Sequence, residues 1–231
     1  MIDDLYPVPN RPALLNLRIA AHEIGHCVSA RVIGSYVHSV SIVPGNGYEG
    51  RCVRSGPPSA LNLASPVPED ETVEILSVCE RLEQIMPEAG DSRIECSEFY
   101  IRAQCSMIEL VAGRVCEKLL HPDLPTLGAV HDDVEARALA RVACAQSDAV
   151  GAMLQYAEAE ARAILIVNLK IVHALVGAIL VAGSLSGDEV DEVIFREISA
   201  QGVAVERANR DDWRRRQASA ARFLVDQQGR A

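Results

Sequence analysis

The sequence predicts a mainly helical domain with a small β-ribbon near its N-terminus, and two observations carry this fold class. First, hydrophobic residues make up 49% of the 231 residues but aromatic residues only 4%, so Ala, Val, Leu and Ile must form the core. This composition favours packed helices over aromatic-rich β-sandwiches. Second, apolar residues recur at helical spacing in most segments, whereas one segment alternates as a strand does.

The first expected elements are a helix and the ribbon. Residues 12–33 have Pro12 near their start, apolar residues at helical spacing and Gly34 as a stop signal, which predicts a helix. Residues 37–45 alternate apolar and polar side chains, and the following GNGYEGRCV returns, which predicts a two-stranded ribbon. Residues 55–66 are rich in Pro, Ser and Gly and predict a loop.

An acidic stretch follows the ribbon. Residues 68–98 contain ten acidic residues against two basic ones and hold most of the formal net charge of -10. Their apolar residues permit one or two helices, so a solvated helical face is expected, and we treat residues 55–98 as an acidic insertion. An acidic protein of this kind has no general electrostatic attraction to nucleic acid, so nucleic acid is not expected as a partner.

Helices are expected over most of the remaining chain. Residues 99–120 have a strong helical pattern that ends at the Pro-rich HPDLP segment. Residues 130–147 and 151–183 predict two more helices, of which the second is long and apolar. The segment SLSGDEVDEVI predicts a short helix with Ser186 as its N-cap.

These elements predict one domain followed by a tail. Residues 1–205 form the domain, and residues 206–231 form a charged, mobile C-terminal tail. The 231 residues contain no GxxxxGK[ST] motif, so we expect no P-loop ATPase within them.

The compartment is predicted from three further features. Residues 163–183 are very apolar, but Asn168, Lys170 and His173 interrupt them, whereas a bilayer span needs about 20 apolar residues in succession. A buried helix is therefore expected here, and no membrane span. The N-terminus lacks the apolar region of a secretory signal, and the seven cysteines include no CxxC pair, which predicts reduced thiols. A cytoplasmic protein is expected.

One motif in the first predicted helix carries chemistry. The segment AAHEIGHCVSA contains HExxH, formed by His22, Glu23 and His26. Residues four apart lie on one face of a helix, so both imidazoles can bind one metal ion. Glu23 projects toward the open coordination position, where it can take a proton from metal-bound water. The motif therefore predicts a catalytic Zn²⁺ site.

The third metal ligand must come from another segment. A catalytic zinc ion takes three protein ligands, and the residues that follow His26 offer none. The candidates are Glu117 in GRVCEKLL and the group His131, Asp132 and Asp133 in GAVHDDVEARALA. The chemistry of these residues alone leaves the choice open.

Four blocks of the sequence, in order, resemble the peptidase domain of the FtsH-type AAA zinc metalloproteases. Residues 18–45 are similar to the family's HEAGHA zinc helix and the strand that follows it. Residues 109–120, 128–140 and 185–194 resemble its LGGRAAEEL, GAxNDLxxAT and LxGEEIDEIL blocks. The resemblance covers roughly residues 15–195. It implies a helical zinc-metallopeptidase domain with the ribbon beside the HExxH helix, as a chain without the ATPase module.

The resemblance also implies how the site is built. The aspartate ligand of the family falls on Asp132, which would hold Zn²⁺ together with His22 and His26. The neighbours of Asp132, His131 and Asp133, stay as alternatives. Glu23 would be the general base.

The expected substrate is an extended polypeptide. It would lie along the strand at residues 38–44 and add a strand to the exposed edge, so that main-chain hydrogen bonds bind it. The expected substrate-binding residues are therefore Val40, Ser41, Ile42 and Val43.

The sequence thus predicts a zinc-dependent endopeptidase that hydrolyses unfolded or flexible polypeptides. A separate ATPase or unfoldase and a second copy of the chain are the further partners considered. The alternative is a catalytically inactive adaptor that retains the peptidase fold, because a fold does not guarantee an activity.

Overall fold

The computed structural model describes residues 8, 11–45, 47–55, 90, 92, 94–127, 130–144 and 146–228. These residues form six helices and one three-stranded antiparallel sheet, which confirms the mainly helical fold class with a small β element. Apart from Ser55, the loop predicted at residues 55–66 lies outside the described residues, and so does most of the acidic insertion.

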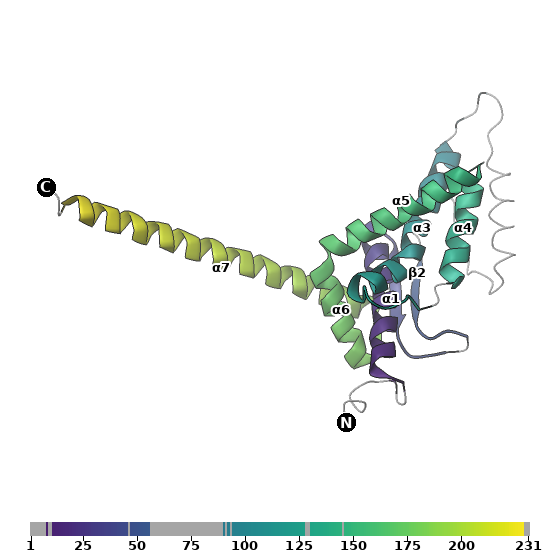
Figure 1. The fold of residues 1–231 in the computed structure, drawn as a ribbon, viewed down its shortest axis with the longest axis horizontal. Helices are drawn as coiled ribbons and strands as arrows, with labels where there is room; N and C mark the ends of the chain where they lie inside the picture. The colour runs from purple at the N-terminus through teal and green to yellow at the C-terminus, as the bar shows by residue number, and fades with distance from the viewer. Residues whose placement is uncertain are drawn as a thin grey trace.

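Helix α1, Ala13–Ile33, lies at the centre of the helical body (Figure 1). It begins after Pro12 and ends at Gly34, as predicted. Gly34 has a φ of 97°, a left-handed conformation that favours glycine, and its N–H donates to the carbonyl of Ala30 at 3.1 Å. Helices α3, α5 and α6 and both strands of the ribbon contact α1, and its residues 23–30 are all buried.

The sheet contains the predicted ribbon and one strand that the sequence analysis missed. Strands β1, Tyr36–Ser41, and β2, Arg51–Ser55, form the ribbon, and β3, Ser184–Ser186, pairs with the other side of β1. The strand order β2-β1-β3 makes β1 the central strand. Three residues are too few to show an alternating pattern, so β3 has no clear signal in the sequence.

The edge of β1 that was expected to receive substrate is closed. The predicted residues are Val40, Ser41, Ile42 and Val43, but β1 pairs with both neighbours over its last three residues. The N–H of Ile42 donates to the carbonyl of Gly183 at 2.9 Å, and the N–H of Val43 donates to Ser41 Oγ at 3.1 Å. The prediction of an open edge on β1 is therefore wrong, because β3 occupies it.

Helix α3, Ile94–Leu120, packs along α1 and begins before the predicted residue 99. The two helices approach so closely that a Cβ at Gly25 would lie 2.5 Å from the carbonyl oxygen of Ala112. Helix α4, Val130–Ala143, contacts α3 and α5. This packing places the first turn of α4 beside the middle of α1.

The single apolar helix predicted over residues 151–183 is two helices. Helix α5, Ser147–Val167, and helix α6, Leu169–Ala182, meet at Asn168 with a bend of 81°. The Asn168 side-chain amide donates to the carbonyl of Ile164 at 2.9 Å, a local hydrogen bond typical of residues that interrupt helices.

The length and hydropathy of these two helices can be compared with what a bilayer span requires. Among the described residues, no helix is by itself both long and apolar enough to cross a bilayer, and only the bent α5–α6 pair reaches that standard together. One face of α6 is buried and packs against α1.

Helix α7, Gly187–Gln228, begins at the predicted cap but is much longer than predicted. Ser186 Oγ accepts the N–H of Glu189 at 3.3 Å, and the Glu189 carboxylate accepts the N–H of Ser186 at 2.7 Å, which forms a capping box. Residues 206–228 of the predicted mobile tail continue this helix. The second half of α7 projects away from the body (Figure 1). Ion pairs one turn apart, such as Arg210 with Glu206, stabilise it locally.

Candidate metal centre

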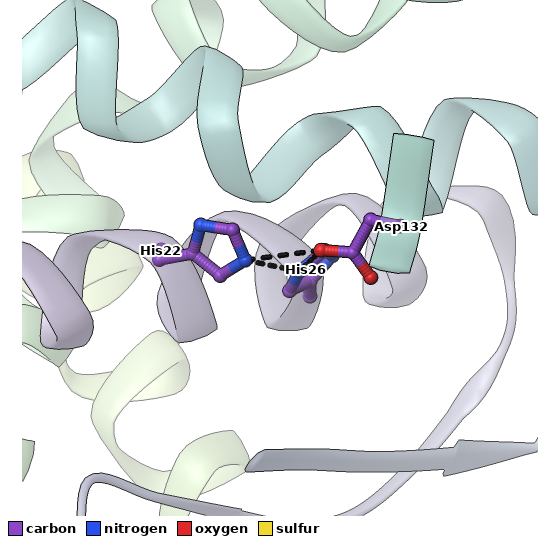
Figure 2. Close-up of side chains that lie close together, drawn as sticks. All are labelled: His22, His26 and Asp132. Atoms are coloured by element: carbon purple, nitrogen blue, oxygen red, sulfur yellow. Dashed lines mark hydrogen bonds and ion pairs between the residues drawn. The ribbon is translucent and has the colours of Figure 1, made fainter. Parts of the chain in front are cut away.

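Three side chains from two helices converge on one point (Figure 2). His22 and His26 lie one turn apart on α1, and Asp132 comes from the first turn of α4. The two Nε2 atoms are 3.0 Å apart, and Asp132 Oδ2 lies 3.1 Å from that of His22 and 3.3 Å from that of His26. Within the described part of the chain, no other group of three His, Cys, Asp or Glu residues brings its ligand atoms this close together.

These distances fit a tetrahedral zinc ion. Ligand atoms about 2.0–2.1 Å from such an ion lie about 3.3 Å from one another, close to the three observed separations. Two imidazole nitrogens and a carboxylate oxygen also repel one another at this range unless a proton or a cation lies among them. Two histidines and one carboxylate are a donor set of catalytic zinc sites. The residues present therefore fit Zn²⁺.

The orientation of the His26 ring is set by helix α3. Its Nδ1–H donates to the backbone carbonyl of Glu109 at 2.7 Å. Because a carbonyl oxygen can only accept, the neutral ring carries its proton on Nδ1 and presents the lone pair of Nε2 to the cluster. This is the arrangement that metal-binding histidines commonly have.

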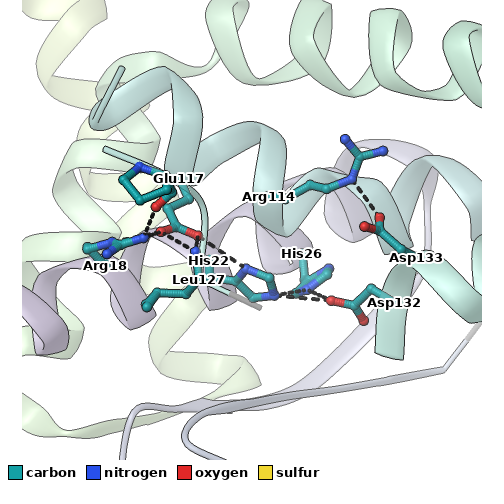
Figure 3. A network of polar contacts seen from close by, with 9 residues as sticks. Arg18, His22, His26, Arg114, Glu117, Leu127, Asp132 and Asp133 are labelled. Atoms are coloured by element: carbon teal, nitrogen blue, oxygen red, sulfur yellow. Dashed lines mark hydrogen bonds and ion pairs between the residues drawn. The ribbon is translucent and has the colours of Figure 1, made fainter. Parts of the chain in front are cut away.

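Glu117 lies behind His22 rather than among the ligands (Figure 3). Its Oε2 is 4.0 Å from His22 Nδ1, on the side of the ring away from Asp132. The carboxylate is almost fully buried and accepts hydrogen bonds from Arg18 Nε at 2.8 Å and the N–H of Leu127 at 2.9 Å. The structure therefore places this candidate ligand in a supporting position.

The two neighbours of Asp132 also point elsewhere. Asp133 Oδ1 forms an ion pair with Arg114 Nε at 2.7 Å, away from the imidazoles (Figure 3). His131 is exposed on α4. Of the candidates that the sequence left open, Asp132 is the one that the structure brings to His22 and His26.

Gly113 on α3 is a site residue that sequence reasoning missed. A Cβ at this position would lie 2.4 Å from His26 Nε2 and 2.7 Å from His22 Nε2, so a side chain here would press on both ligand atoms. A sequence signal was available. A glycine inside a helix is unfavourable by about 1 kcal/mol relative to alanine, and such a residue usually has a packing or functional reason.

The chain matches no protein-family model, and no curated protein is significantly similar to it in sequence.

Glu23, the predicted general base, lies on α1 next to His22 and is buried. Its side chain is close to Gly50, where an added Cβ would lie 2.9 Å from Glu23 Oε1. Burial raises the pKa of Glu23 above its ordinary value, although the two imidazoles act in the opposite direction. A carboxylate whose pKa is raised toward neutrality is a better proton acceptor at physiological pH.

Zinc binding should weaken as the pH falls through the pKa of His22. Burial lowers this pKa, but the hydrogen bond to Asp132 and the charges of Glu23 and Glu117 outweigh burial, so that it is raised above 6.5. Zn²⁺ binds the neutral imidazole, so below this pKa a competing proton lowers the affinity about tenfold per pH unit. Burial would raise the pKa of Asp132, but the close approach of both imidazoles holds it well below its usual range, so Asp132 stays ionised.

Competition with a chelator of known affinity, from about pH 8 to about pH 5.5, measures this dependence across the titration of a histidine. A zinc affinity that stays constant over this range would contradict the assignment of His22 as a ligand.

Proposed function

We propose that this chain is a zinc-dependent endopeptidase that hydrolyses unfolded or flexible polypeptides. The observation that carries the proposal is the convergence of the two HExxH imidazoles with the Asp132 carboxylate, with Glu23 buried beside them. The ordered blocks that resemble FtsH-type peptidase domains support it further, and a zinc-peptidase fold of that type is part of the proposal.

The residues of this chain divide the chemistry between them. A zinc ion held by His22, His26 and Asp132 would lower the pKa of a bound water and polarise the scissile carbonyl. Glu23 accepts the proton that the attacking water loses and passes it to the leaving amine. Gly50, the residue before β2, lies so close to the Glu23 side chain that a Cβ there would be 2.9 Å from Glu23 Oε1.

Strand β2 is a better candidate than β1 for binding substrate. Among the described residues it pairs on one side only, so its other edge has unpaired backbone groups. Gly50 immediately precedes β2 and lies against Glu23, so a peptide added to this edge would pass close to the general base. Binding of this kind requires an extended backbone, which favours unfolded or flexible substrates.

A comparison of two substrates tests the proposal. The protein should cleave a denatured protein and leave a stable folded domain intact, because an extended segment must first be released by local unfolding. A chelator should abolish cleavage, added zinc should restore it, and ATP should have no effect, since the sequence contains no P-loop. A chain that holds one zinc ion but cleaves no unfolded protein would be an adaptor, which would contradict the peptidase proposal.

A further inference from the structure

We propose that Arg114 is a positioning residue for the metal centre. Through its ion pair with Asp133 it fixes the first turn of α4, so that Asp132 and not its neighbour faces the imidazoles. The inference rests on the proposed metal site, but it concerns two residues that lie outside the group of ligand atoms.

Arg114 links three helices around the site. It follows Gly113 on α3, and because successive residues of a helix diverge by about 100°, it points away from the imidazoles that Gly113 faces. Its Nε lies 2.7 Å from Asp133 Oδ1 on α4, and its Nη2 lies 2.6 Å from Glu158 Oε1 on α5 (Figure 3 for the first pair). One guanidinium therefore connects α3, α4 and α5.

The consequence for α4 follows from the same helical geometry. Asp132 and Asp133 are adjacent and diverge by about 100°, so only one of them can face α1 in a given rotation of the helix. Both lie in the first turn of α4, and terminal turns of helices fray easily. The cation of Arg114 holds Asp133 toward α3 and so selects the rotation in which Asp132 reaches His22 and His26.

The expected effect differs in kind from that of an ordinary ion pair. The side chains of Arg114 and Asp133 are 23% and 48% exposed, and ion pairs at such positions contribute little to the stability of a fold. Residues that orient a metal ligand, in contrast, typically change metal affinity 10–100-fold. The loss of a nearby positive charge should by itself strengthen zinc binding, so the proposal and a simple charge effect predict opposite signs for Arg114→Gln.

Zinc affinity, measured by chelator competition in the full chain, tests the proposal. Arg114→Gln and Asp133→Ala should each weaken zinc binding about 10–100-fold. Both substitutions remove the same ion pair, so combining them should not weaken binding beyond the larger of the two single effects. Arg114→Lys, which keeps the charge, should recover much of the affinity. The matched control is Glu158→Gln, which removes the other ion pair of Arg114 and should stay within about twofold of the parent, as expected for a residue away from the ligands.

The outcomes separate this inference from the proposed function. If Arg114→Gln binds zinc as tightly as the parent, or if Glu158→Gln weakens binding equally, the positioning role is overturned while the metal site stands. If the parent binds zinc but cleaves nothing, the peptidase proposal fails, and the affinities still decide the role of Arg114. A parent chain that takes up no zinc overturns both. Should Arg114→Gln fail to fold, the test is Asp133→Ala against Glu158→Gln. Each removes one carboxylate from the same guanidinium, so a simple charge effect would weaken zinc binding in both variants, whereas the positioning role weakens it only in Asp133→Ala.

Discussion

Replacing Glu23 by glutamine should abolish peptide hydrolysis and leave zinc binding unchanged. Glutamine has nearly the same shape but cannot accept the proton, and loss of a general base typically lowers the rate 10²–10⁴-fold. The folded chain should tolerate the change, because burial already disfavours the ionised form of Glu23. The rate on a denatured protein substrate, measured at equal zinc content, checks this.

The control for this experiment is Glu192→Gln, which removes an exposed carboxylate of α7 far along the chain from the site. It should cleave at the parental rate. Hydrolysis by Glu23→Gln at the rate of the parent would show that Glu23 is not the base.

Adding one methyl group at Gly113 should prevent zinc binding without removing any ligand. The Cβ would lie 2.4 Å from His26 Nε2, inside van der Waals contact, so the imidazoles would have to leave their positions. We expect zinc affinity to fall more than about 100-fold, beyond the range typical of residues that only support a ligand. Chelator competition on Gly113→Ala measures this loss.

Gly151→Ala is the matched control. This glycine also lies inside a helix, α5, but an added Cβ there meets nothing within 4 Å. The substitution should leave zinc binding intact and stabilise the helix by up to about 1 kcal/mol. Parental zinc affinity in Gly113→Ala would mean that His22 and His26 do not bind the ion in the positions that the structure gives them.

Local signals in the sequence predicted where several elements begin and end. Pro12 and Gly34 bound α1, and Ser186 caps α7, because these residues act on the backbone within one turn. The break at Asn168 was missed because asparagine inside an apolar run is compatible with a continuous helix by pattern alone. Strand β3 depends on a partner far away in the sequence, so no local pattern predicts it.

The site residues differ in how far the sequence could predict them. The spacing of His22 and His26 places both imidazoles on one face of any helix, with Glu23 next to the first of them. Asp132 could be chosen only through the resemblance to a family, because the chemistry of its neighbours is equally suitable. The selection of Asp132 depends on how α4 packs against α3, and the role of Gly113 depends on how α3 crosses α1. Such contacts between helices are not encoded in local spacing.

The metal content of the purified chain tests the central claim most directly. Elemental analysis should find about one zinc ion per chain, since the site offers a single set of three ligands. The zinc should be retained in Glu23→Gln and lost in a variant with His26→Ala. Iron in place of zinc would contradict a hydrolytic centre, because two histidines and one carboxylate also form the iron site of oxygenases. A chain that contains no metal, and takes up none when zinc is added, would contradict the account as a whole.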